Sequence, residues 1–170
     1  MGNKFKEIRP EDISENPFKL FDIDWMLITA GNLNSFNTMT ASWGGFGVLW
    51  NKNIAICFIR PQRYTFQFVE KNSFFSLCFF EEKYREILSY CGAESGKNVN
   101  KIQKTGLIPF LTKNNCIAYE QSKLIIECRK IYSDIIRNDK FIDAMIPLDI
   151  YPTQDYHHIY VGEILQCFTK

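Results

Sequence analysis

Histidine is scarce in this chain: the 170 residues contain only two, His157 and His158, and they are adjacent. Adjacent side chains of an extended strand point to opposite faces, so this pair does not readily converge on one metal ion. The six cysteines do not compensate, since none forms a Cys-x-x-Cys pair and the closest two, Cys116 and Cys128, lie twelve positions apart. We therefore expect no metal site, and we expect the thiols to be reduced and mostly packed in the core.

Long apolar runs and an excess of charge are also missing. No apolar run approaches the roughly 20 residues that span a bilayer, and residues Met1–Lys6 are polar and basic with no apolar segment behind them. Lys and Arg number 20 against 19 Asp and Glu, which leaves a formal charge of +1 and no long-range attraction for a phosphate backbone. The expectation is a cytoplasmic protein that has no membrane segment and no nucleic acid partner.

Several common catalytic signatures fail on inspection. Residues Gly92–Asn98 resemble a P-loop, but one residue is missing between the glycines and the motif ends in Asn where Ser or Thr is needed. Residues Gly44–Gly47 have no third glycine at the position that a dinucleotide-binding motif requires, and no long helix follows them, so they are expected to form a flexible bend. No Gly-x-Ser-x-Gly elbow occurs. ATP or GTP chemistry, a Rossmann site and a serine or cysteine hydrolase are not supported.

Apolar residues are abundant, at 46% of the chain with 15% aromatic, and no linker or internal repeat interrupts them. A chain of this length and composition is expected to fold as a single domain over residues 1–170. Apolar, β-branched and aromatic runs predict strands over residues 25–30, 53–59, 73–80, 116–120, 123–136 and 158–168. Helical spacing predicts helices over residues 62–71 and 81–91, and a small one over 139–145.

This order of elements predicts a mainly β fold with short helices. Because no helix follows the last strand and few helices separate the others, a doubly wound parallel sheet is disfavoured. An antiparallel barrel, with Greek-key or up-and-down connections, fits the pattern better.

Residues Asn37–Trp43 form the first candidate site segment. Thr40, Ala41 and Ser42 leave the backbone approachable, so peptide N–H groups could donate to the polar edge of a flat ring while Trp43 packs on it or beside it. The alternative is an ordinary strand whose polar side chains face water.

A second segment, Arg60-Pro-Gln-Arg63-Tyr64-Thr65, places two guanidinium groups and a hydroxyl at the start of a predicted helix. Free N–H groups and the helix dipole favour an anion at that end of a helix, so a phosphate would bind there. The alternative is that both arginines pair with surface carboxylates.

Four pieces of sequence, taken in order, resemble the flavin reductase-like, FMN-binding split-barrel family. They are Asn-x-Met-Thr-x-Ser-Trp at residues 37–43, Arg-Pro-x-Arg-Tyr-Thr at 60–65, Ser95-Gly96 with Lys101, and His-His-Ile-Tyr-Val-Gly-Glu at 157–163. The similarity covers roughly residues 25–168. It implies an antiparallel Greek-key split β-barrel and a homodimer with FMN near the interface.

The resemblance also assigns positions to the cofactor. Asn37–Ser42 would line the isoalloxazine and ribityl groups, Trp43 would contact the ring, and the segment Arg60–Thr65 would hold or neighbour the phosphate. Lys101 would approach the cofactor, with Lys97 as a competing candidate, and His157 competes with His158 in the same way. The implied FMN-binding residues are Asn37, Thr38, Met39, Thr40, Ala41, Ser42, Trp43, Arg60, Arg63, Tyr64, Thr65, Ser95, Lys101 and His157.

Three functions remain open at this stage. The first is an oxidoreductase that passes hydride from NADH or NADPH to flavin N5 and onward to flavin, a metal complex or a partner protein. The second is a flavoredoxin-like FMN electron-transfer protein that uses no nicotinamide, and the third is a barrel that binds a non-redox ligand. None of the three needs a dedicated catalytic acid or base.

Overall fold

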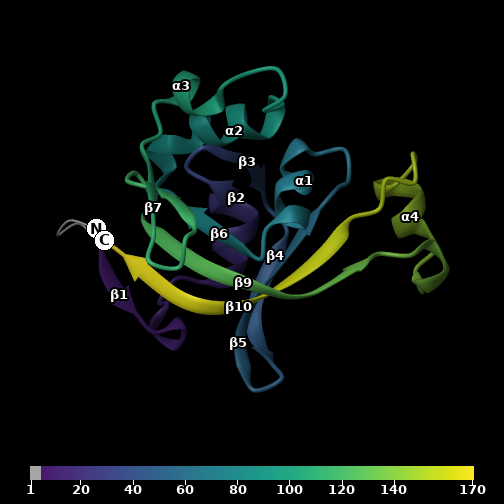
Figure 1. Cartoon of the computed structure of the whole chain (residues 1–170). Helices are drawn as coiled ribbons and strands as arrows, with labels where there is room; N and C mark the ends of the chain where they lie inside the picture. Colours follow the sequence, from purple (N-terminus) through teal and green to yellow (C-terminus); the bar gives the residue numbers. More distant parts are fainter. Residues whose placement is uncertain (1–4) are drawn as a thin grey trace.

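A computed structural model describes residues 5–170, and one antiparallel sheet dominates it (Figure 1). Eight strands of the described residues belong to this sheet. Their spatial order is β3 (Ser35–Ala41), β2 (Met26–Asn32), β6 (Phe74–Phe79), β9 (Leu124–Ile135), β10 (His158–Thr169), β5 (Lys52–Ile59) and β4 (Gly44–Leu49), with β1 (Lys6–Ile8) paired to the end of β10. A separate hairpin joins β7 (Pro109–Leu111) to β8 (Ile117–Tyr119).

The two ends of the strand order meet at one corner. β3 and β4 lie at opposite ends of the sheet, yet only Ser42 and Trp43 connect them along the chain. A two-residue connection spans less than about 11 Å, so the sheet has to curl until its edges approach each other. The predicted mainly β antiparallel barrel with short helices is confirmed.

The core fills the inside of the curled sheet. Strands β2, β6 and β9 contribute buried apolar side chains that pack together, among them Ile28, Leu77, Phe79 and Ile126. All six cysteines are free and buried, which confirms the expectation that the thiols are core residues.

Short helices cover the β3 side of the sheet. α1 (Tyr64–Lys71) follows Pro61, and α2 (Arg85–Ala93) follows the 3₁₀ turn η3 (Glu82–Tyr84). α1 packs against β2 and β3, and α2 packs against β3. The remaining helical elements are η1 (Pro10–Asp12), the π-helical turn η2 (Lys19–Asp24), α3 (Lys101–Thr105), η4 (Asn138–Lys140) and α4 (Met145–Ile150). None of the helices within residues 5–170 has the length and apolarity needed to cross a membrane.

The small helix expected over residues 139–145 is wrong in position. Only Asn138–Lys140 forms a 3₁₀ turn there, and α4 begins at Met145. The Asp143 carboxylate accepts a hydrogen bond from the Met145 backbone N–H at 2.9 Å and so marks the start of the helix. Pro147 then lies in the first turn, where its missing N–H removes no helical hydrogen bond.

The flexible bend expected at Gly44–Gly47 is also wrong, because these residues belong to strand β4 and pair with β5. A Cβ atom at Gly44 would lie 2.5 Å from Phe21 Cε1 and 2.6 Å from the Ile56 carbonyl oxygen. Glycine is therefore needed at Gly44 for close approach of the backbone, and not for flexibility.

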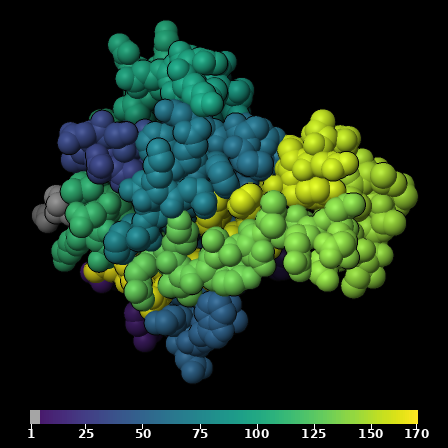
Figure 2. Space-filling view, turned by 45° about the vertical axis from the view of Figure 1, so that its right-hand side comes forward, coloured from purple at the N-terminus to yellow at the C-terminus, as the bar shows by residue number. Residues whose placement is uncertain are grey.

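An arm projects from the barrel. The far ends of β9 and β10 continue into residues 136–157, which carry η4 and α4 away from the body of the molecule (Figures 1 and 2). Large apolar side chains are exposed along this arm, including Ile142, Met145 and Leu148.

Candidate functional site

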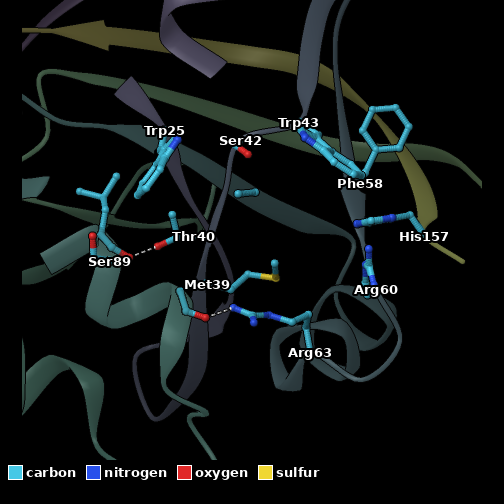
Figure 3. A pocket seen from close by; sticks show the side chains of 13 residues that line it. Trp25, Met39, Thr40, Ser42, Trp43, Phe58, Arg60, Arg63, Ser89 and His157 are labelled. Atoms are coloured by element: carbon cyan, nitrogen blue, oxygen red, sulfur yellow. Dashed lines mark hydrogen bonds between the residues drawn. The ribbon is translucent and has the colours of Figure 1, made fainter. Parts of the chain in front are cut away.

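A cavity of about 520 Å³ lies at the corner where β3 passes into β4 (Figure 3). Its floor is the end of β3, and α2, the end of β5 and the residue before β10 supply its sides. The cavity is lined by Trp25, Met39, Thr40, Ala41, Ser42, Trp43, Phe58, Arg60, Arg63, Leu88, Ser89, Gly92 and His157.

A second pocket, of about 60 Å³, adjoins the first one at the start of α1. Met39 and Arg63 line both, so the two hollows are neighbours. The smaller one, called the anion pocket below, is lined by Asn37, Met39, Gln62, Arg63, Tyr64, Thr65, Ala93, Glu94, Ser95, Gly96 and Lys101.

The residues predicted from sequence divide between these two hollows. Thr40–Trp43, Arg60 and His157 line the cavity, and Asn37, Tyr64, Thr65, Ser95 and Lys101 line the anion pocket, while Met39 and Arg63 line both. Thr38 lines neither, because its hydroxyl turns into the core and lies 2.9 Å from the Thr29 hydroxyl.

A buried cation, Lys101, and a half-buried one, Arg63, both line the anion pocket. Lys101 is 5% exposed and its Nζ donates to the Thr38 and Cys91 carbonyl oxygens at 2.8 and 2.7 Å. The Arg63 Nη2 donates to the Gly92 carbonyl oxygen at 2.6 Å (Figure 3). Among the described residues, no carboxylate forms an ion pair with either cation.

Electrostatics at this pocket favour an anion. Burial lowers the pKa of Lys101 to about 8, and the charge on Arg63 acts in the same direction, while Cys91 and Glu94 oppose it. Burial also lowers the pKa of Arg63. Buried charges are costly unless paired, so an anionic ligand would relieve an unfavourable concentration of positive charge.

Hydroxyl and amide groups complete the anion pocket. The Asn37 Nδ2 donates to Thr65 Oγ1 at 2.7 Å, and Thr65 makes no other side-chain hydrogen bond within residues 5–170. The proton of the buried Thr65 hydroxyl is thus left for another acceptor.

Arg60 differs from Arg63 in its partners. It lines the cavity but not the anion pocket, and its Nη1 lies 2.6 Å from the Asp155 carboxylate. Hydrogen bonds from Thr153 and Arg60 hold the pKa of Asp155 well below its usual range. The paired-carboxylate alternative considered for both arginines therefore applies to Arg60 and not to Arg63.

The two adjacent histidines face different surroundings. The His157 ring packs 4.9 Å from the Trp43 ring in the cavity wall, whereas His158 packs 4.7 Å from Phe66. Burial and the nearby Arg60 charge lower the pKa of His157 to about 4, so its imidazole is neutral at pH 7. Of the two histidines, His157 is the one placed at the cavity.

The two candidate lysines are also distinguished by position. Lys97 Nζ lies 5.7 Å from the Tyr64 ring centre and does not line the anion pocket, whereas Lys101 does.

Five cavity residues were missed by sequence reasoning. Trp25 has a positive φ of 64° at the end of η2, and the Arg85 guanidinium lies 4.2 Å from its ring centre. No local sequence pattern indicates that the five missed residues line one cavity, because they come from elements that are far apart in the chain. The missed residues are Trp25, Phe58, Leu88, Ser89 and Gly92.

Comparison with known proteins identifies one family. Residues 21–170 match the family model described as "Flavin reductase like domain". A comparison with curated proteins found no match.

Solved structures share the fold. Flavoredoxin from Methanosarcina acetivorans superposes with a TM-score of 0.65 at 21% identity, covering 86% of this chain and 68% of that one. Flavoredoxin of Desulfovibrio vulgaris gives 0.68 at 17% identity, covering 96% and 77%. An NADH:FAD oxidoreductase of Streptomyces globisporus gives 0.64 at 12% identity, covering 86% and 74%.

Proposed function

The chain belongs to the flavin reductase-like family, and from this premise we propose that it is an FMN-binding oxidoreductase that takes hydride from NADH or NADPH. The observation that carries the proposal is a pair of cations, the half-buried Arg63 and the buried Lys101, that have no carboxylate partner among residues 5–170 and lie beside a larger aromatic-walled cavity. A planar ring that carries a phosphate on a short chain matches both hollows at once.

The residues present fit FMN on size and chemistry. A cavity of about 520 Å³ is in the usual range for a small-molecule site. Thr40, Ala41 and Ser42 are small enough to leave the β3 backbone approachable to a ring edge, and Trp43 offers an aromatic surface. In the anion pocket Arg63 and Lys101 would bind the phosphate, with the Thr65 hydroxyl as a further donor.

When bound, FMN supplies the redox chemistry by accepting hydride at its ring N5. The chain's own groups bind and orient the ring, and the apolar side chains Met39, Phe58 and Leu88 keep water from that part of the cavity. His157 is a neutral hydrogen-bonding group at the cavity wall. No acid or base among these residues is required for the transfer.

A homodimer and a reducing compartment belong to the same proposal. Exposed apolar side chains on the arm, such as Ile142 and Leu148, and Trp50 at the turn between β4 and β5, would be covered by a second copy. Six free, buried thiols are typical of cytoplasmic proteins. Light scattering should give twice the chain mass of 20.0 kDa.

The deciding experiment follows the visible spectrum of protein purified without added flavin. FMN addition should produce a bound-flavin spectrum, and anaerobic NADH or NADPH should then bleach it rapidly. Bands that persist with both nucleotides would favour the electron-transfer function instead. Failure to bind FMN would overturn both functions and leave the non-redox ligand.

Lys101 should make FMN affinity depend on pH. The ammonium group is charged below its pKa of about 8 and neutral above it. A phosphate beside the ammonium raises that pKa, so above pH 8 binding has to take up a proton, and the dissociation constant should rise by up to about tenfold per pH unit. Fluorescence titration from about pH 7 to about pH 9 measures this.

Two variants test whether Lys101 causes this pH dependence. Lys101→Met should weaken FMN binding at pH 7 and abolish the rise above pH 8, whereas Lys97→Ala, which removes a cation outside the anion pocket, should preserve it. Riboflavin, which lacks the phosphate, should show no such rise. A pH-independent FMN affinity in the unmodified protein would remove Lys101 from the phosphate site.

A further inference from the structure

Tyr151 joins the projecting arm to the cavity wall. It directly follows α4, is 4% exposed, and its hydroxyl oxygen lies 2.8 Å from His157 Nδ1. Its ring packs against Tyr156 at 4.9 Å and Phe141 at 6.0 Å between ring centres. Sequence reasoning assigned no role to this residue.

The direction of the Tyr151–His157 hydrogen bond follows from the need of a buried phenol for an acceptor. Burial raises the pKa of Tyr151, so its O–H stays protonated, and Nδ1 is the only side-chain partner of this hydroxyl within residues 5–170. If Nδ1 carried the imidazole proton, the buried phenolic proton would have no acceptor. Nδ1 therefore accepts, and the proton of the neutral ring is on Nε2.

Arg60 contacts the segment that carries Tyr151 and so stabilises the Tyr151–His157 pair. Besides its ion pair with Asp155, it donates from Nη2 to the Ile150 carbonyl oxygen at 3.0 Å, and its guanidinium carbon lies 5.2 Å from the Tyr151 ring centre. Arg60 directly follows β5, so these contacts connect Ile150 and Asp155, the two ends of the segment 150–155, to the end of that strand. Arg60 and Asp155 are the charged groups that act on His157, and they pair with each other.

The His157 ring is held from the other side by Trp43, 4.9 Å away. Figure 3 shows the ring reaching into the cavity between Trp43 and Arg60. Its Nε2 makes no hydrogen bond to a described residue, so the N–H is available to a ligand in the cavity.

We propose that Tyr151 is a positioning residue that holds His157 as a neutral Nε2–H donor, aimed at a carbonyl or carboxamide oxygen of the redox pair in the cavity. This oxygen belongs to the flavin ring or to the nicotinamide, and the donor chemistry is the same for both. The inference rests on the proposed function for its ligand, but the tautomer itself does not depend on that function.

Nitrogen NMR of the histidine rings tests the tautomer directly. In ligand-free wild-type protein at neutral pH, the His157 ring should show a protonated Nε2 and an unprotonated Nδ1. In Tyr151→Phe, which keeps the aromatic packing and loses only the hydroxyl, the ring should become a mixture of tautomers and its pKa should rise from about 4 by about 1 unit. Finding the proton on Nδ1 in the wild type would overturn the proposal.

The matched control is Tyr156→Phe. Tyr156 packs against Tyr151, but its hydroxyl donates to Asn138 Oδ1 at 2.8 Å and not to a histidine. It should leave the His157 tautomer unchanged. A tautomer change of equal size in Tyr156→Phe would mean that loosened packing, and not the lost hydroxyl, is responsible.

Activity then distinguishes the two acceptors. If the Nε2–H faces the nicotinamide, Tyr151→Phe should lower kcat/KM for the nucleotide about three- to tenfold and leave FMN affinity unchanged. If the Nε2–H faces the flavin, Tyr151→Phe should instead lower FMN affinity about three- to tenfold. In a His157→Gln background the Tyr151→Phe change should have no further effect on either quantity. An altered tautomer with both quantities unchanged would refute the positioning role, while a protein that binds no FMN would refute only the proposed function.

Discussion

Arg63→Ala should raise the dissociation constant of FMN by about ten- to a hundredfold at neutral pH. Charge-assisted hydrogen bonds to a phosphate contribute about 1.5–3 kcal/mol, and Arg63 is a half-buried cation with no carboxylate partner among the described residues. Within residues 5–170, the Arg63 side chain forms one hydrogen bond, which it donates to the Gly92 carbonyl oxygen. Flavin fluorescence quenching measures the effect.

Riboflavin and Arg129→Ala supply the controls for Arg63→Ala. Because riboflavin has no phosphate, its affinity should change much less than that of FMN in the Arg63 variant. Arg129 is an arginine of β9 that pairs with Glu163 away from both hollows, so its removal should leave FMN binding intact. Equal losses for FMN and riboflavin would mean that Arg63 shapes the cavity and does not bind the phosphate.

Gly96→Ala should weaken FMN binding about tenfold or more. An added Cβ would lie 2.0 Å from Asn37 Oδ1 and 2.9 Å from Asn37 Cγ. Asn37 is buried and bonded to Thr65, so either the loop at Gly96 or the Asn37 side chain has to move. Overpacking of this kind costs about 1–3 kcal/mol, and either movement deforms the anion pocket.

Gly47→Ala is the matched control, since a Cβ at Gly47 would meet no atom within 4 Å. It should leave both FMN affinity and the melting temperature close to those of the wild type. Unchanged FMN affinity in Gly96→Ala would contradict the placement of the phosphate in the anion pocket, because either movement changes the shape of that pocket.

Strands β2, β5, β6, β9 and β10 of the barrel were predictable because their signal is local, whereas no strand was predicted over β1, β3 or β4. The apolar run that ends at Arg60-Pro61 predicts a strand over 53–59, and β5 is Lys52–Ile59. Pro61 likewise marks the start of the helical region that contains α1. Two predictions, at residues 44–47 and 139–145, were wrong because the backbone conformation that a glycine or proline favours depends on its surroundings. Gly44 lies in a strand and contacts Phe21, and Pro147 lies within the first turn of α4.

For the candidate site, the sequence by itself indicated two segments that line the hollows, residues 37–43 and 60–65, because residue type and spacing are local properties. Only the tertiary structure decided which cations have partners. Arg60 pairs with Asp155, far along the chain, whereas Arg63 and Lys101 line one pocket and form no ion pair with a carboxylate of residues 5–170. The link from Tyr151 to His157 is also a tertiary result. Charge compensation and hydrogen-bond direction depend on which groups folding brings within a few ångströms of each other, and local sequence patterns do not contain those distances.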